Sequence, residues 1–173
     1  MTAARKDNAV FEAITPAMAA RMQALEAMDA ADRSDGTPHA KRLRQIPPET
    51  GRFLAILAAS APAGNLVEVG TSAGYSALWL SLACRARGGV LTSIDRDPDK
   101  LVLAEETLRL AGCVDAVRLV RGDALEALAA MRDIAFAFVD ANRDVLWPCA
   151  ALLVERLVPG GILTADNVIS HAH

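Results

Sequence analysis

The fold of this chain is predicted from one stretch, Leu66-Val67-Glu68-Val69-Gly70-Thr71-Ser72-Ala73-Gly74-Tyr75-Ser76. A short apolar run containing an acid breaks at two glycines four residues apart and continues into the helix-periodic residues 77–83. This pattern predicts a buried strand, a tight loop and the start of a helix. Glycine at position 70 allows a positive φ and a close approach of a ligand, and free N–H groups at the start of a helix favour a negative group. The junction therefore predicts a ligand site.

The spacing of the glycines indicates which ligands fit this site. A dinucleotide fingerprint, G-x-G-x-x-G, needs a glycine where this chain has Ser72, and the chain has no G-K-S/T phosphate loop. Glu68, which precedes the first glycine, suits a cationic group such as an ammonium, while the helix start and Ser76 suit a carboxylate. The amino-acid end of a ligand would supply both groups.

A second acid extends this interpretation. Asp95 closes the next apolar run, residues 90–94, and an acid at the carboxyl end of a second strand can accept from both hydroxyls of a ribose. An amino acid joined to a ribose indicates S-adenosylmethionine. Either acid alone is more simply explained as a loop cap, whereas the pair on consecutive strand ends favours the ligand.

Length and composition predict one domain. The chain has 173 residues, of which 53% are hydrophobic, which is enough for a core of ordinary size. We expect a single domain over 1–173, with a helical lead over 1–38 and a cofactor-binding α/β core over 39–173. A net charge of −3 argues against a nucleic-acid-binding surface, since such surfaces are usually basic.

Neither a membrane location nor a cysteine framework is predicted. The N-terminus lacks an apolar segment, and no run reaches about 18 uninterrupted apolar residues, so we expect a cytoplasmic protein without a membrane partner. The three cysteines, Cys84, Cys113 and Cys149, stand singly. They are expected to be reduced and buried, and not to bind zinc or form disulfides.

The N-terminal lead is predicted to be helical, because apolar residues recur every three or four positions from Val10 to Met28. Thr15-Pro16 is expected to end one helix and begin another. The methionines in this stripe suit a substrate wall, a dimer seam or plain core packing, and these alternatives stay open. The basic run at 41–44 precedes the double proline at 47–48; a solvated run is favoured there over a contact with an acidic substrate.

From residue 65 onward, strands and helices alternate at the spacing of a parallel sheet. After the first strand the pattern predicts four more, at Val90–Ile94, Val117–Val120, Ile134–Val139 and Ile162–Thr164, with intervening helices that include one opened by Asp97 and Pro98 and closed near Gly112, and one ending near Leu157. The strands are apolar on both faces, which indicates a doubly wound, mostly parallel α/β sheet with helices on both sides. Ligands of such folds lie at the carboxyl ends of the strands.

Further polar residues follow these strand ends. Asp123 follows the third strand, where it would either accept from an adenine amino group or cap the next helix. Asp140 follows the fourth strand, and Asp166-Asn167 follow the fifth. If the fourth and fifth strands lie side by side, three oxygen ligands converge, and this set suits Mg²⁺, with Ca²⁺ or Mn²⁺ as alternatives. The alternative is that Asp140 serves only the cofactor and Asp166-Asn167 only shape a turn; the coincidence of three oxygen donors favours the metal.

With these residues assembled, residues 42–170 resemble the cation-dependent O-methyltransferases of the catechol and caffeoyl-coenzyme A type. The resemblance rests on V-E-V-G-x-x-x-G-Y-S, I-D-x-D-P, G-D-A, F-V-D-A and P-G-G-x-x-x-x-D-N taken as a set. It implies a class I methyltransferase fold and a small hydroxylated substrate, for instance a catechol. The cofactor-binding residues that we expect are Ile46, Glu68, Gly70, Ser72, Gly74, Tyr75, Ser76, Asp95, Arg96, Asp123, Ala124 and Asp140. The implied metal ligands are Asp140, Asp166 and Asn167.

The sequence departs from this family in two ways. The family usually has a lysine base three residues after the first metal aspartate and a tyrosine soon after it, whereas this chain has Arg143 and Leu146. Arginine stays protonated, so the catalytic roles expected here are metal binding for Asp140 and phenolate stabilisation for Arg143. The family also continues past residue 173 with two more strands, one of which pairs antiparallel with the fifth strand, so we expect a shortened domain with an exposed edge strand. Either another chain covers this edge in a homodimer, or the protein is less stable and tends to aggregate. The alternatives are an inactive cofactor-binding protein and a cation-independent methyltransferase.

Overall fold

A computed structural model of the protein describes residues 10–166 and 168. The helices are α2 (Pro16–Asp32), the short 3-10 helix η1 (His39–Lys41), α3 (Pro48–Ser60), α4 (Tyr75–Arg87), α5 (Pro98–Ala111), α6 (Ala124–Ala129) and α7 (Arg143–Val154). The strands are β1 (Asn65–Val69), β2 (Leu91–Asp95), β3 (Val117–Arg121), β4 (Ile134–Val139) and β5 (Leu157–Ala165).

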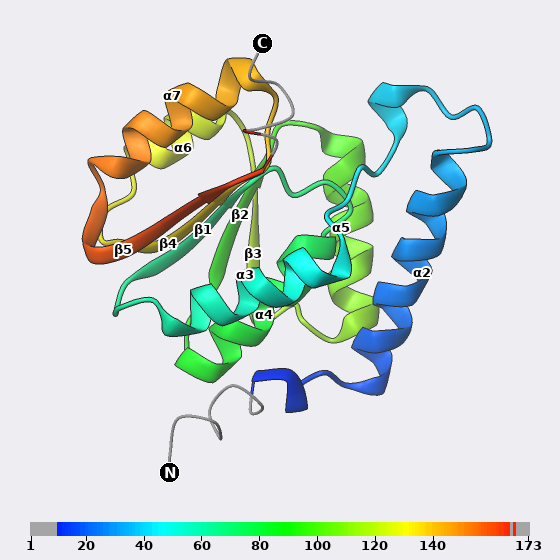
Figure 1. The fold of residues 1–173 in the computed structure, drawn as a ribbon, viewed down its shortest axis with the longest axis horizontal. Helices are drawn as coiled ribbons and strands as arrows, with labels where there is room; N and C mark the ends of the chain where they lie inside the picture. The colour runs from blue at the N-terminus through cyan, green and yellow to red at the C-terminus, as the bar shows by residue number, and fades with distance from the viewer. Residues whose placement is uncertain (1–9, 167, 169–173) are drawn as a thin grey trace.

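The five strands form one sheet in the order β3-β2-β1-β4-β5, and every neighbouring pair is parallel. Helices cover both faces, as Figure 1 shows. The doubly wound α/β fold predicted from the sequence is therefore confirmed, as is the adjacency of the fourth and fifth strands.

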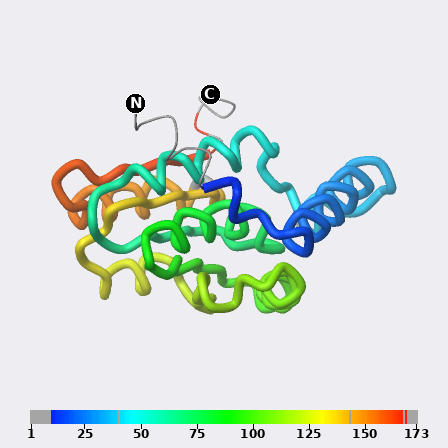
Figure 2. Tube along the Cα trace, turned by 90° about the horizontal axis from the view of Figure 1, so that it is seen from below, coloured from blue at the N-terminus to red at the C-terminus, as the bar shows by residue number. Residues whose placement is uncertain are grey.

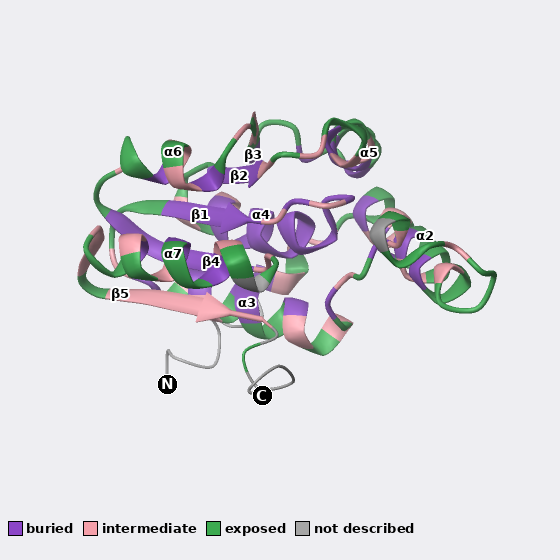
Figure 3. Ribbon diagram, turned by 90° about the horizontal axis from the view of Figure 1, so that it is seen from above, coloured by how far each residue is buried: buried purple, intermediate pink, exposed green. Residues whose placement is uncertain are grey.

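Side chains that alternate along the strands build a core on each face of the sheet. Leu66 and Phe136 pack with residues of α3, α4 and α5 in one core. Val67 and Ala137, one position further along each strand, pack with residues of α6 and α7 in the other. Figure 3 shows the central strands buried and β5 at the sheet edge with intermediate exposure. Glu68 points to the first face with Leu66, so an acid lies inside an apolar layer.

Strand β5 and the helix before it differ from the sequence prediction. Helix α7 ends at Val154, not near Leu157, and β5 begins at Leu157 instead of Ile162. Leu157 already pairs with Ile134, and the register shifts between Ile134 and Phe136. Gly160, with φ +79°, lies within the strand. The Pro-Gly-Gly sequence therefore makes an irregularity inside the strand and not a turn before it.

Helix caps lie where the sequence predicts them. The Thr15 hydroxyl accepts from the Met18 N–H at 3.1 Å and begins α2. Asp97 caps α5, and Gly112 ends it in the left-handed conformation.

Helix α2 lies at one side of the layered body, against α5 and α4 (Figures 1 and 2). Met18, Met22 and Leu25 are buried in the core on that face, so the methionine stripe packs the core, whereas Met28 is 40% exposed. Arg21 donates to the Thr107 hydroxyl and ties α2 to α5.

The three cysteines are free and buried, as expected. Within the described residues, no helix combines the length and the apolar character that crossing a membrane requires.

Candidate functional site

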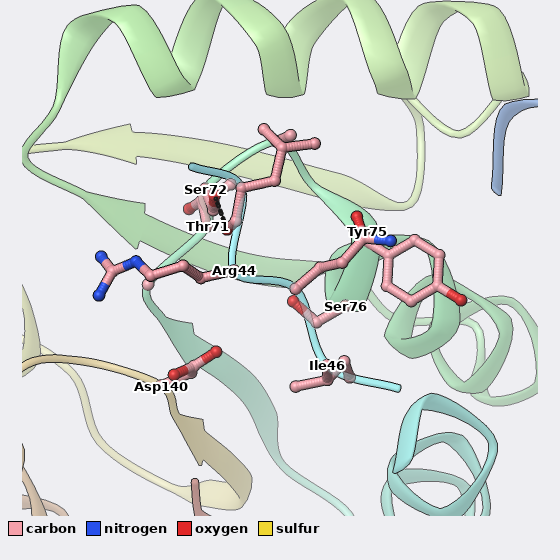
Figure 4. Close-up of a pocket in the computed structure, with 11 residues that line it drawn as sticks. Arg44, Ile46, Thr71, Ser72, Tyr75, Ser76 and Asp140 are labelled. Atoms are coloured by element: carbon pink, nitrogen blue, oxygen red, sulfur yellow. Dashed lines mark hydrogen bonds between the residues drawn. The ribbon is translucent and has the colours of Figure 1, made fainter. Parts of the chain in front are cut away.

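A pocket lies at the carboxyl ends of β1 and β4, between the β1–α4 loop and the segment that precedes α3 (Figure 4). It is a small cavity of about 20 Å³. Its lining residues are Leu43, Arg44, Gln45, Ile46, Gly70, Thr71, Ser72, Ala73, Tyr75, Ser76 and Asp140. Parallel sheets bind ligands at the carboxyl ends of their strands. The glycine loop, residues 70–74 between β1 and α4, forms one wall of the pocket.

Gly70 is required where the loop leaves β1. Its φ is +98°, and a Cβ there would lie 2.0 Å from the carbonyl oxygen of Asp140. The Asp140 N–H in turn donates to the Val69 carbonyl at 2.9 Å. Because no side chain intervenes, the β1–α4 loop runs directly against the end of β4, which brings Asp140 into the pocket.

Glu68 lies fully buried in the core below this loop. Its Oε2 accepts from the Ser93 hydroxyl at 2.5 Å, and the Ser93 and Thr71 hydroxyls are 2.6 Å apart. Its Oε1 has no hydrogen-bond partner among the residues that the structure describes. Burial raises the pKa of Glu68 to about 7; the Ser76 and Ser93 hydroxyls oppose that rise, and the negative charges of Asp140 and Asp95 add to it. A cation next to these three carboxyl groups would favour the ionised form of Glu68.

Asp95 ends β2 and organises the backbone around the pocket. Its Oδ2 accepts from the Ser72 N–H at 2.9 Å, and its Oδ1 accepts from the Asp97 N–H at 3.0 Å. Each carboxylate oxygen has a second lone pair, so these bonds are compatible with the predicted ribose contact.

The two described members of the predicted metal set follow neighbouring strands. Val139 and Ala165 are register partners, and the Asp166 N–H donates to the Val139 carbonyl at 3.0 Å. Asp140 and Asp166 therefore each come directly after one of two residues that are paired across β4 and β5. Asn167, the third predicted ligand, lies outside the described residues, and within them no cluster of three His, Cys, Asp or Glu side chains is suited to a metal.

The predicted cofactor residues divide into two groups. Those that line the pocket are Ile46, Gly70, Ser72, Tyr75, Ser76 and Asp140; those that do not are Glu68, Gly74, Asp95, Arg96, Asp123 and Ala124.

Two residues of the glycine loop also have packing roles. Gly74 has φ +84°, and a Cβ there would contact α5 at Ala104 and Thr107. The Tyr75 hydroxyl donates to Glu26 of α2 at 2.6 Å. The second glycine of the loop therefore brings α4 close to α5, and Tyr75 links the pocket wall to α2.

The residues predicted to lie near adenine are at the β2 and β3 ends. Arg96 is exposed and Ala124 is buried. Asp123 caps α6, accepting from the Leu125 and Glu126 N–H groups through Oδ1. The capping role is therefore observed, while an adenine contact through the other oxygen stays a prediction.

Arg143, the residue that replaces the family's lysine, is the first residue of α7. The side chain of Arg143 is not among the described parts of the structure, so its catalytic role stays a prediction.

The sequence model of a family described as O-methyltransferase matches residues 25–173. The chain belongs to this O-methyltransferase family.

Similar proteins agree with this membership. The chain is 30% identical over 129 residues to a catechol O-methyltransferase of Niastella koreensis, covering 72% of this chain and 58% of the relative. It is 32% identical over 125 residues to a catechol O-methyltransferase of Mycobacterium tuberculosis, covering 70% of this chain and 56% of the relative. The chain thus spans little more than half the length of these relatives.

A solved structure shares the fold. The O-methyltransferase TomG of Streptomyces achromogenes, involved in tomaymycin synthesis and solved in complex with SAM, is 28% identical, with a TM-score of 0.69. The match covers 85% of this chain and 66% of TomG.

Several residues in or beneath the pocket were not predicted. Leu43 and Arg44 belong to the basic run for which a solvated position is favoured from the sequence, yet with Gln45 they form one wall of the pocket. Ser93 was missed although a signal existed, because it is a polar residue inside an apolar strand and is the register partner of Glu68. Aligning the two strands by their ends would have placed this hydroxyl beside the acid.

Proposed function

We propose that this chain binds S-adenosylmethionine in the pocket between the β1–α4 loop and residues 43–46. The methyl group would pass to a hydroxyl oxygen of a small molecule, such as a catechol, with the help of a divalent cation. Family membership and relatives that carry the name catechol O-methyltransferase support this proposal.

The observation that carries the proposal is the buried carboxyl group of Glu68. Its Oε1 lacks a described partner, and Asp95 and Asp140 add negative charge around it. Such an arrangement disfavours an anion and favours a cationic ligand. S-adenosylmethionine carries two cationic groups, an ammonium and a sulfonium, so the site fits this cofactor better than a dinucleotide.

The remaining parts of the cofactor have candidate partners. Asp95 would hold the ribose hydroxyls, and the N-terminus of α4 together with Ser76 would hold the carboxylate. Ile46, buried at 3% exposure beside the pocket, would supply an apolar contact.

Asp140, Asp166 and Asn167 would hold the divalent cation, Mg²⁺ being the best match for three oxygen donors. A bound cation would supply acidity to the acceptor hydroxyl, and this matters because Arg143 stays protonated and cannot act as a base.

In the reaction, the bound cofactor supplies an electrophilic methyl group. The acceptor oxygen forms the new O–C bond while the S–C bond breaks, its electron pair stays on sulfur, and the hydroxyl proton leaves to solvent. The residues of the pocket hold the two reactants in line, and this positioning provides much of the acceleration.

Two measurements test the proposal. Isothermal titration with S-adenosylmethionine and with S-adenosylhomocysteine should show binding, and the absence of binding would refute the proposal. Methyl transfer to catechol, assayed with Mg²⁺ and with a chelator, should be lost in the chelator. Binding without transfer would indicate an inactive cofactor-binding protein, and transfer that persists in the chelator would indicate a cation-independent enzyme.

A further inference from the structure

One wall of the pocket is held in a strained conformation. Residues 41–46, which we call the strap, run from the last residue of η1 toward α3, and Arg44 within them has φ +50°. Ser72, on the facing loop, has φ +45°, and its hydroxyl donates to the Leu43 carbonyl at 3.0 Å. Non-glycine residues in this region cost free energy and persist where the surroundings impose them, often at ligand sites.

Helix α2 imposes the conformation of Arg44 from both sides. The N–H of Leu43, the residue before it, donates to Asp32 Oδ2 at 2.9 Å. The N–H of Gln45, the residue after it, donates to Asp29 Oδ1 at 3.2 Å. Two carboxylates of one helix therefore fix the peptides that flank Arg44.

Helix α5 fixes the start of the strap. The Lys100 ammonium group donates to the carbonyls of Lys41 at 3.1 Å and Arg42 at 2.9 Å. These two bonds, the two bonds to the α2 carboxylates and the bond from Ser72 hold the strap in place. The strap is therefore a preorganised wall attached to α5, α2 and the β1–α4 loop.

The strap carries the guanidinium group of Arg44. Arg44 lines the pocket, is exposed, and takes part in none of the ion pairs formed among the described residues. Figure 4 shows it extending on the side of the pocket where Asp140 lies, while Tyr75 extends to the opposite side. Arg44 thus reaches toward the place where the acceptor hydroxyl would lie, and away from the Ser76 side proposed for the cofactor carboxylate.

We propose that Arg44 is a specificity-determining residue that binds a carboxylate on the methyl acceptor. This inference rests on the proposed function and narrows its substrate class to hydroxylated acids. Glu68, Asp95 and Asp140 add negative charge to the site, and the guanidinium of Arg44, an exposed side chain on a backbone that its neighbours hold, supplies a positive group for an anionic acceptor. A guanidinium pairs with a planar carboxylate through two parallel hydrogen bonds.

The experiment compares a dihydroxybenzoate with vicinal hydroxyls against catechol, its uncharged counterpart. Binding to the protein loaded with S-adenosylhomocysteine and Mg²⁺ is measured by titration, and kcat/KM is measured with S-adenosylmethionine. The wild type should prefer the acid. Arg44→Met should lower the preference for the acid, measured as the acid-to-catechol ratio of affinities and of kcat/KM values, by roughly 5–20-fold, in keeping with a charge-assisted pair that is partly open to water. Arg44→Lys should restore part of the preference.

Lys41→Met is the matched control, because it removes the same charge from an exposed strap residue that does not line the pocket. It should keep the preference, whereas an equal loss in both variants would indicate general attraction and overturn the proposal. Asp32→Ala should reduce the preference by freeing the strap, and Asp32→Asn, which still accepts from Leu43, should retain it.

The binding titration separates the two proposals. If the wild type transfers methyl groups but binds acid and neutral acceptor equally, the role of Arg44 is refuted and the proposed function stands. If it transfers no methyl group, the proposed function fails, and the Arg44 dependence of acid binding still decides the inference.

Discussion

A single residue, Glu68, links the charge of the site to the stability of the fold. Its carboxyl group is fully buried, and its folded-state pKa of about 7 exceeds the ordinary value of 4.5. The folded state therefore binds this proton more tightly than the unfolded state. The stability that the proton contributes is fully present below pH 4.5 and is lost as the pH rises through about 7.

We therefore expect Glu68→Gln to stabilise the ligand-free protein at alkaline pH. Glutamine keeps the size and removes the cost of the buried charge, so the gain should approach roughly 3 kcal/mol above pH 7 and vanish near pH 4. Urea unfolding across this range measures the difference. Glu106→Gln, a change at an exposed acid of α5, should alter stability little at any pH. A gain that does not depend on pH would contradict the assigned pKa.

A second residue-scale prediction concerns Asp95. Asp95→Ala removes the proposed ribose acceptor and the acceptor of the Ser72 N–H, so cofactor affinity should fall by roughly 1.5–3 kcal/mol. Asp95→Asn, which keeps one acceptor oxygen, should lose less. Titration with S-adenosylhomocysteine measures both variants, and unchanged affinity in the alanine variant would remove Asp95 from the site.

At the scale of elements, apolar runs and caps predicted most of the fold. Strand β4 lies where its six apolar residues place it, and Asp97 with Gly112 bounds α5 as predicted. Strand β5 was predicted too short because Gly160 and Gly161 usually end a strand, whereas here the pairing with β4 continues past them. Local signals of this kind cannot report a partner strand that keeps the backbone extended.

Helices α3 and α4 pack so closely that one glycine decides their contact. A Cβ on Gly51 would lie 2.3 Å from the Trp79 ring. Gly51→Ala should therefore destabilise the protein by about 1–3 kcal/mol through overpacking, despite the better helix propensity of alanine. Gly89→Ala is the control, because nothing lies within 4 Å of its Cβ position. Thermal or urea unfolding of the pair tests this; equal stability would show that the ring moves aside freely.

The ends of β4 and β5 form the proposed cation site together. Asp166→Ala should abolish methyl transfer while titration with S-adenosylhomocysteine still shows cofactor binding, since Asp166 is not among the residues that line the pocket. Full activity of this variant in the presence of a chelator would refute the cation mechanism.

At the scale of the whole molecule, the site joins segments that only the fold brings together. The glycine loop and the strand-end acids were predicted because parallel sheets gather their carboxyl ends. The strap was not, because α2 holds Leu43 through Asp32 and Gln45 through Asp29, across 11 and 16 residues respectively. A hydrogen bond between a side chain and a distant backbone N–H leaves no periodic pattern in the sequence. The sequence therefore favoured a solvated run that includes Arg44.

The last prediction couples cofactor binding to the stability of the whole chain. S-adenosylmethionine at about 100 times its Kd should stabilise the folded state by roughly 2.7 kcal/mol, which for a chain of this size raises Tm by about 5–10 °C. The ammonium group of bound S-adenosylmethionine favours the ionised form of Glu68. Binding must therefore release the proton that Glu68 carries at low pH. At equal ligand concentration, the shift in Tm should therefore be larger near pH 7.5 than near pH 5.5, a range below the α-amino pKa of about 8 in which the ligand stays cationic. Glu68→Gln should lose most of this pH dependence. A shift that is independent of pH in the wild type would place the ammonium group away from Glu68.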